Sequence, residues 1–301
     1  MKPALSIVVF TVLSGAGLGL AAVLAAAVVV VGAAADVFWL SLALSALLTG
    51  GGLLASVGHL ANPKNAWRAI MRIRTSWLSR EAALAVLFFA LSALWAWQRY
   101  QYGDGESALL PLAVLFCALA AVYCTAMIYQ SLKPIAAWHH PLTSACYLAL
   151  ALHSGAALFA AVSQSPKAAA LVLPFAAAAA FGKGLHYRRI GKVRDVRIGR
   201  AAGFSRAKAK LLETGHTGQT FLTREFMFSA PAAMLAKMRA ASMLLCFIPP
   251  VIGAVLLLFW QTALWMIIAL PFMFAGLLME RWLFFAEARH SIRAYHGDGK
   301  P

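Results

Sequence analysis

Ionisable side chains gather at the ends of several apolar stretches in this sequence. His59 closes one long apolar stretch, and Glu81 follows Arg80 at the start of the next. Glu280 and Arg281 lie near the end of the last one. A histidine and a carboxylate can exchange protons near neutral pH, so His59 and Glu81 have the chemistry to act on a bound ligand. The simpler interpretation is that these groups anchor helices at an interface and pair with nearby arginines.

The elements that carry these residues are predicted to be membrane-spanning helices. Hydrophobic residues make up 62% of the 301 residues and charged residues 12%, whereas a soluble protein has about 25% charged residues. A spanning helix needs about 20 apolar residues. We therefore predict an all-α polytopic membrane protein, a single membrane domain over residues 1–301. Its eight transmembrane helices are predicted at residues 5–32, 37–60, 81–98, 108–131, 141–163, 168–185, 240–260 and 262–286.

Lysine and arginine are distributed unevenly between the two sides of this predicted bundle. We call the side of the N-terminus side A. The connection 61–80 and the long connection 186–239 lie on side A and are rich in Lys and Arg, whereas side B has Arg99 and Lys167. By the positive-inside rule, side A and both termini are predicted to be cytoplasmic. The net charge of +16 is thereby explained by topology, and no nucleic-acid partner is expected.

A short sequence similarity within the chain indicates two parallel repeats of four helices. Ser76–Glu81 reads Ser-Trp-Leu-Ser-Arg-Glu, and Thr220–Glu225 reads Thr-Phe-Leu-Thr-Arg-Glu. Both copies lie on side A, before the third and the seventh predicted helix. The predicted repeat halves are residues 1–140 and 141–301, related by an axis along the membrane normal.

The sequence offers little for a metal centre. The cysteines form no Cys-x-x-Cys pair and lie within apolar stretches, so neither an iron–sulfur cluster nor structural zinc is expected in this chain. A haem between helices needs facing histidines, and His153 alone lies deep in a predicted helix, so no haem is expected. His153 is predicted to make a hydrogen bond between helices. The cysteines are Cys117, Cys124, Cys146 and Cys246.

Three motifs resemble the membrane anchor subunits of dimethyl sulfoxide reductase-type molybdoenzymes. The first runs from Ser56-Val57-Gly58-His59-Leu60-Ala61-Asn62-Pro63 to Arg80-Glu81. The second is Ile128-Tyr129-Gln130-Ser131-Leu132-Lys133-Pro134-Ile135 with Trp138-His139, and the third is Glu280-Arg281-Trp282-Leu283-Phe284-Phe285. The resemblance extends over nearly the whole chain.

This resemblance implies an eight-helix anchor in a bacterial inner membrane that exchanges electrons with quinone, either ubiquinone or menaquinone. The implied partners are an iron–sulfur electron-transfer subunit and a molybdopterin catalytic subunit, which would carry out the substrate chemistry. The family's functional histidine and glutamate fall on His59 and Glu81. The quinone head group is then expected at the side A interface between the second, third and eighth helices, with Arg80, Glu280 and Arg281 as further candidate contacts.

Orientation distinguishes two versions of this function. In the well-known dimethyl sulfoxide reductases the corresponding end of the anchor is assigned to the periplasmic face, whereas the charge distribution here puts it in the cytoplasm. The stretch 133–139 is closer to anchors of cytoplasmic sulfite-oxidising enzymes that reduce quinone, which favours a sulfite dehydrogenase. The alternatives are a menaquinol-oxidising dimethyl sulfoxide reductase anchor, a purely structural anchor, and a transporter. A transporter should carry polar residues at mid-membrane, where this sequence has few beyond His153.

Overall fold

The computed structural model describes residues 1–32, 35–58, 63–103, 107–193 and 226–293. Within these residues, eight helices are long and apolar enough to cross a membrane, which confirms the predicted all-α fold and number of spans. A short 3-10 helix, η1 (Pro63–Arg72), precedes α3. The eight are α1 (Leu5–Val30), α2 (Ala35–Val57), α3 (Trp77–Tyr102), α4 (Leu109–Gln130), α5 (Leu142–Ser163), α6 (Pro166–Ile190), α9 (Ala232–Trp260) and α10 (Leu264–Ala286).

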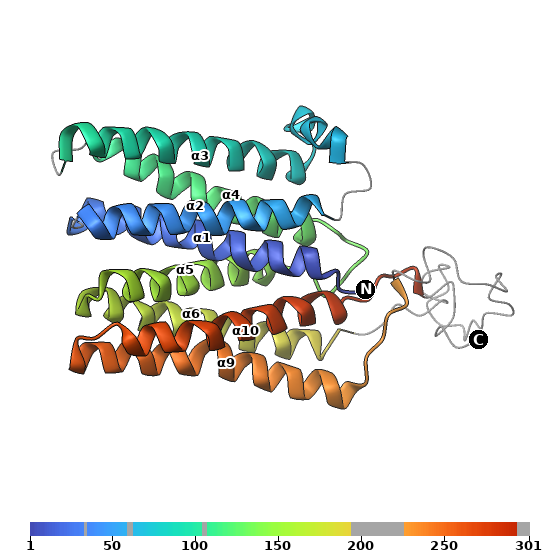
Figure 1. Cartoon of the computed structure of the whole chain (residues 1–301). Coiled ribbons are helices and arrows are strands. Elements are labelled where there is room, and N and C mark those ends of the chain that lie inside the picture. The colour runs from blue at the N-terminus through green and yellow to red at the C-terminus, as the bar shows by residue number, and fades with distance from the viewer. Residues whose placement is uncertain (33–34, 59–62, 104–106, 194–225, 294–301) are drawn as a thin grey trace, which may run out of the picture.

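The helices run up and down in chain order and form one bundle (Figure 1). The N-terminus and η1 lie at the same end of the bundle, which is side A and is on the right in Figure 1. Helices α3 and α4 pack together at one edge, and α9 and α10 pack together at the other. Helix α1 lies between these pairs and contacts α2, α4, α5 and α10.

Three helices extend four or more residues beyond a predicted end. Helix α3 begins at Trp77 because the Ser76 side chain accepts a hydrogen bond from the backbone N–H of Ser79, a typical N-cap. Helix α6 continues to Ile190, and α9 already begins at Ala232. Hydropathy identifies the apolar residues that lie in the hydrocarbon core of the membrane. Helical hydrogen bonding continues beyond them into the polar interface. The predicted connection 186–239 is therefore shorter, and its two ends belong to helices.

Small residues let the central helices approach closely. Ser45 Oγ on α2 donates to the Gly17 carbonyl oxygen on α1, at 2.7 Å. On the opposite face of α1, a Cβ atom at Gly19 would collide with the backbone of Ala151 on α5. A Cβ atom at Gly155 would collide with the backbone of Gly19. Glycine is required at these two positions because backbone meets backbone, the expected use of small residues between membrane helices.

His153 joins α5 to α9, as predicted. Its side chain is fully buried, and Nε2 lies 3.0 Å from the carbonyl oxygen of Cys246. Within a regular helix that carbonyl would accept from the N–H four residues later, but this position is Pro250, which has none. His153 therefore supplies the donor that the proline removes, and the hydrogen bond satisfies a carbonyl that lipid cannot satisfy.

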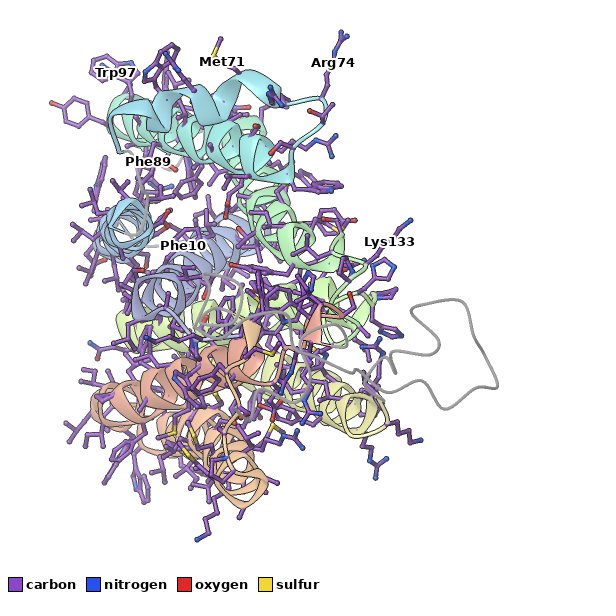
Figure 2. The ribbon with its side chains drawn as sticks, turned by 90° about the vertical axis from the view of Figure 1, so that its right-hand side faces the viewer. Phe10, Met71, Arg74, Phe89, Trp97 and Lys133 are labelled. Carbon is purple, nitrogen blue, oxygen red and sulfur yellow. The ribbon has the colours of Figure 1, made fainter. Side chains whose placement is uncertain are left out.

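Two described segments on side A are held against the helices around them. Arg189 at the end of α6 donates to the carbonyl oxygens of Ala136 and Ala137 in the α4–α5 connection, at 2.8 and 3.2 Å. The ammonium group of Met1 donates to the carbonyl oxygen of Ala288, just after α10, at 2.7 Å. Figure 2 looks onto this end of the bundle, where the side chains of Arg74 and Lys133 project outward. Side A is thus an ordered, basic surface in the part described.

The proposed repeat remains a prediction. Its second copy, Thr220–Glu225, lies outside the described residues. The first copy overlaps the start of α3, with Glu81 four residues after Trp77, whereas α9 begins at Ala232, seven residues after position 225. The two copies therefore have different places relative to the helix that follows each of them.

Candidate functional site

Glu81 is a buried carboxylate at the side A end of α3. Its side chain is 6% exposed, and Oε1 is hydrogen-bonded to the hydroxyl of Thr125 on α4. Thr125 Oγ1 also lies 3.1 Å from the carbonyl oxygen of Ala121, one turn earlier in α4. Because a hydroxyl carries a single hydrogen, Thr125 can serve Glu81 in either state. It donates to a carboxylate, or it accepts from a carboxylic acid while donating to Ala121.

Arg80 points away from Glu81, although the two are adjacent in sequence. Its guanidinium donates from Nε to the carbonyl oxygen of Ile73 at 2.9 Å and from a terminal nitrogen to that of Arg74 at 2.8 Å. It also lies over the ring of Trp77, 4.1 Å from the centroid. Arg80 therefore fastens the η1–α3 turn, and Glu81 instead faces Thr125.

His59 lies outside the described residues, so the structure does not test its proximity to Glu81. Helix α2, which ends at Val57, contacts α3 only slightly. Near side A, Leu54 and Val57 on α2 and Leu78 on α3 are exposed. Apolar side chains exposed along membrane helices are surfaces for lipid or for a lipid-like ligand.

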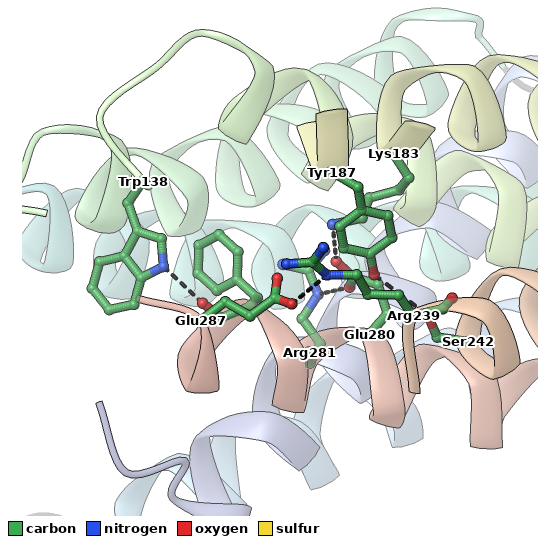
Figure 3. A network of polar contacts seen from close by, with 9 residues as sticks. Trp138, Lys183, Tyr187, Arg239, Ser242, Glu280, Arg281 and Glu287 are labelled. Carbon is green, nitrogen blue, oxygen red and sulfur yellow. Dashed lines mark hydrogen bonds and ion pairs between the residues drawn. The ribbon is translucent and has the colours of Figure 1, made fainter. Parts of the chain in front are cut away.

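Glu280 and Arg281 belong to a buried ionic cluster with Lys183, shown in Figure 3. Glu280 Oε1 lies 2.5 Å from Lys183 Nζ on α6, and Glu280 Oε2 lies 2.7 Å from Arg281 Nε. All three side chains are at least nine-tenths buried. Two cations share one anion, so this cluster has one positive charge more than negative charges. Buried charges are retained only when paired, and in a membrane they usually mark function.

The ionic cluster continues toward the side A surface (Figure 3). The ring of Tyr187 lies against Lys183, with Nζ 4.5 Å from its centroid, and its hydroxyl lies 3.3 Å from Ser242 Oγ. Arg239 Nε lies 2.5 Å from Glu287 Oε1, just after α10. Burial raises the pKa of Glu287 above its ordinary value, against the opposing effect of Arg239. Glu287 and Arg239 line a surface cavity of about 360 Å³.

Two of the motifs noted in the sequence meet in an aromatic cluster on side A. Trp138 stacks on Phe284 with ring centroids 5.2 Å apart, and its indole N–H donates to the Phe284 carbonyl oxygen at 2.9 Å. Tyr129 lies edge-on to Trp138, Phe284 and Phe285, with centroids 5.1 to 5.4 Å apart. Motifs that are about 150 residues apart therefore form one packed unit that joins α4, the α4–α5 connection and α10.

The structure brings some candidate residues together and separates others. Helix α10 packs mainly on α9, α1 and α5 rather than on α2 or α3. Glu280 therefore faces Lys183 and is not a direct neighbour of Glu81. Arg281 nevertheless lines a small cavity together with Thr125, the partner of Glu81, and with Tyr147. Sequence reasoning misses Thr125, Tyr147 and Lys183, although a lysine inside an apolar stretch is a usable signal for Lys183.

Comparisons with known proteins agree with this architecture. The profile of the family described as "DMSO reductase anchor subunit (DmsC)" matches residues 1–286. The chain is 35% identical to a sulfite dehydrogenase subunit of Allochromatium vinosum over 323 aligned positions, covering 98% of this chain and 99% of that protein. It is also 35% identical to "Anaerobic dimethyl sulfoxide reductase chain YnfH" of Escherichia coli, over 43% of this chain and 46% of that one. This chain therefore belongs to the DMSO reductase anchor subunit family, the membrane anchors of dimethyl sulfoxide reductase-type complexes.

Proposed function

We propose that this anchor subunit reacts with quinone at the side A end of α2 and α3. In this proposal it passes electrons between the quinone pool and an iron–sulfur subunit docked on side A, which in turn serves a molybdopterin catalytic subunit. The observation that carries the proposal is Glu81, a carboxylate buried in a membrane helix whose described hydrogen-bond partner is a neutral hydroxyl. Such a group is costly in hydrocarbon and is therefore expected to have a function.

The residues near Glu81 fit a quinone head group in their chemistry. A bound quinone exchanges two electrons and two protons with its surroundings. Glu81 can hold or release a proton because Thr125 stabilises both of its states through the alternative acceptor at Ala121. His59, placed by the sequence just after α2, is the proposed second hydrogen-bond partner. The exposed Leu54, Val57 and Leu78 provide an apolar surface for the isoprenoid tail.

Within this function, we assign electron flow from sulfite oxidation in the cytoplasm to quinone in the bacterial inner membrane. The support is the near full-length similarity to a protein named as a sulfite dehydrogenase subunit and the Lys/Arg excess on side A. The second candidate is a menaquinol-oxidising anchor of a dimethyl sulfoxide reductase, favoured by the partial similarity to the Escherichia coli protein. Membranes supplied with sulfite or with dimethyl sulfoxide distinguish the two by whether quinone is reduced or quinol is consumed.

The test uses His59→Ala and Glu81→Gln in the assembled complex. Because proton exchange at Glu81 is the proposed step, quinone-coupled turnover should fall by about 100-fold or more. Electron transfer between the soluble subunits and an artificial dye should remain. Glu287→Gln is the matched control, since it removes a carboxylate on the same side of the membrane that is not proposed to contact quinone. Normal quinone turnover in both site variants would contradict the proposal and favour a purely structural anchor.

Partner docking is proposed on side A, over η1 and the surface with Arg74 and Lys133. An iron–sulfur cluster must come close to the quinone for fast electron transfer, and Glu81 lies near this side. The alternative use of this basic surface is attraction to anionic lipid, worth about 1 kcal/mol for each basic residue. Crosslinking from Arg74→Cys and Lys133→Cys in native membranes decides between them. Crosslinks to an iron–sulfur subunit support docking, and labelling by lipid alone contradicts it.

A further inference from the structure

A small cavity with polar and apolar lining lies between α1, α4, α5 and α10. Its volume is about 20 Å³. Thr125, Tyr147 and Arg281 line it, together with residues of α1 that include Gly15. A cavity of at least about 10–15 Å³ holds one water molecule when two to four polar groups surround it. An aromatic ring needs several times this volume, so the quinone head group does not fit here.

The cavity has three polar groups with capacity for a further hydrogen bond. Arg281 Nη1 and the hydroxyl of Tyr147 are buried and interact with each other, but neither has a hydrogen bond of regular geometry among the described residues. The guanidinium of Arg281 instead lies over the ring of Tyr147, 3.9 Å from its centroid. Thr125 Oγ1 can also accept a hydrogen bond. A buried polar group left without a partner costs about 1–3 kcal/mol, and more when it is charged.

The other hydroxyls around the cavity donate within their own helices and, like Thr125, can still accept a hydrogen bond. Ser154 Oγ donates to the Leu150 carbonyl oxygen at 2.9 Å, and Ser14 Oγ donates to that of Phe10 at 2.6 Å. Tyr147 and Arg281 therefore bring the donors that lack a regular hydrogen bond, and Thr125 is the cavity hydroxyl that contacts Glu81. They come from three helices, and a water molecule has enough donors and acceptors for all three.

We propose that this cavity is a binding site for a single water molecule that links Glu81, through Thr125, to the ionic cluster of Lys183, Glu280 and Arg281. The inference rests on the proposed proton exchange at Glu81. Arg281 Nη1 donates to the water oxygen, and the water donates to Thr125 Oγ1. When Glu81 takes up a proton, the Thr125 hydroxyl rotates and donates to the Ala121 carbonyl oxygen instead of to Glu81. The Thr125 oxygen then accepts from protonated Glu81 and from the water. The proton stays on Glu81, and neither Thr125 nor the water is ionised.

The water also gives the ionic cluster a role in this exchange. Lys183 and Arg281 carry two positive charges against the single negative charge of Glu280. A hydrogen-bonded chain through polarised groups transmits this excess charge toward the carboxylate more effectively than apolar packing would. Arg281 and Thr125 are thus positioning residues for Glu81, and no direct contact between Arg281 and quinone is required.

Gly15 allows the cavity to be filled without removing a polar group. A Cβ atom at Gly15 would meet no atom within 4 Å, and alanine is favoured over glycine in a helix. Gly15→Ala should therefore fold and displace the water. Gly51→Ala on α2 is the matched control, because Gly51 has the same open space and does not line the cavity. Thr125→Val removes the hydroxyl at nearly constant shape, and Thr125→Ser retains it.

The experiment combines a structure of the purified complex with kinetics. A cryo-EM map that resolves other buried waters should contain density within hydrogen-bond distance of Thr125, Tyr147 and Arg281, and Gly15→Ala should lose it. Quinone turnover and its solvent isotope effect are then compared. We expect turnover to fall about tenfold in Gly15→Ala and Thr125→Val, with an altered isotope effect. Gly51→Ala should match the native protein, and Thr125→Ser should retain more turnover than Thr125→Val.

An empty cavity in the native map, or density that follows added bromide, would overturn the water site. Native turnover in Gly15→Ala and Thr125→Val, with Glu81→Gln inactive, would overturn its role while leaving the quinone function intact. Full activity of Glu81→Gln would contradict the proposed function and not the water site. The cryo-EM map alone would then show whether the water is bound.

Discussion

His153 on α5 lies 3.0 Å from the Cys246 carbonyl oxygen on α9, which Pro250 leaves without its helical donor. Two separate sequence features, a deep histidine and a proline inside a helix, are therefore parts of one interaction. The proline does not weaken the bundle at this point, because a neighbouring helix replaces the missing hydrogen bond.

The first prediction concerns this pair. His153→Leu leaves the Cys246 carbonyl without a partner and should lower the free energy of unfolding by about 1–3 kcal/mol. Pro250→Ala restores the N–H within α9, so it should recover most of that loss in the His153→Leu background and gain less in the native background. Unfolding in mixed detergent measures all four proteins. An equal effect of Pro250→Ala in both backgrounds would mean that the two residues are not coupled.

The second prediction compares how much stability is lost when different residues of the ionic cluster are replaced. Glu280→Gln leaves Lys183 and Arg281 as buried cations without an anion, so it should destabilise the protein by about 3–5 kcal/mol. Lys183→Met leaves Glu280 paired with Arg281 at 2.7 Å and should cost clearly less. Thermal unfolding of the purified subunit in detergent compares them. The reverse order would show that the excess positive charge is balanced by a group outside the cluster.

The third prediction concerns membrane orientation. All four cysteines are buried, so a newly introduced cysteine can be labelled against a low background. Lys133→Cys on side A should react with a membrane-impermeant maleimide in inside-out vesicles and stay unlabelled in intact cells. Ser107→Cys on side B should behave in the opposite way. Labelling of Lys133→Cys from outside the cell would reverse the orientation and remove the support for cytoplasmic sulfite oxidation.

The fourth prediction concerns pH and the start of α5. The Leu142 backbone N–H donates to Nδ1 of His140 at 3.2 Å, which requires a neutral ring. Partial burial, with Arg189 and His139 nearby, lowers the pKa of His140 below its usual value. Its contribution to stability is therefore present above the unfolded-state pKa of about 6.5 and is lost as the pH falls through the lower folded-state pKa.

His140→Asn retains an acceptor for Leu142 without an ionisable ring. Its unfolding temperature should decline less than that of the native protein between about pH 7 and pH 5. Comparing the two proteins removes the contribution of the other histidines. Parallel pH profiles would show that His140 does not cap α5.

Hydropathy predicts the eight helices of this fold because the membrane imposes apolar helices of a set length. The ends of α3, α6 and α9 could not be predicted in the same way, since the bilayer limits the apolar stretch and not the helix. Glu81 stands out as a carboxylate at the start of an apolar stretch. Its partner Thr125 does not, because a threonine inside a membrane helix is common and the pairing depends on how α3 packs on α4.

The candidate site was also only partly predictable from the sequence. The three motifs shared with the anchor family identify segments of the site, but which of them lie together depends on tertiary packing. Tyr129 and Trp138 meet Phe284 and Phe285 only because α10 returns to side A beside α5. In the sequence, Glu280 is a helix-end residue that could pair with any nearby arginine. In the folded chain it is fully enclosed, and its second cation, Lys183, comes from a helix that sequence spacing does not connect to it.

The central place of α1 has a consequence for biogenesis. This helix is synthesised before the segments that enclose it, which include α5 and α10, more than 100 and 200 residues later in the chain. Until α5 is inserted, the surface of α1 at Gly19 lacks the helix that packs against it. The last helix closes the bundle, and the Met1 ammonium then reaches the Ala288 carbonyl. Insertion of α1 therefore precedes the packing that covers its faces, and the bundle is complete only when α10 is in place.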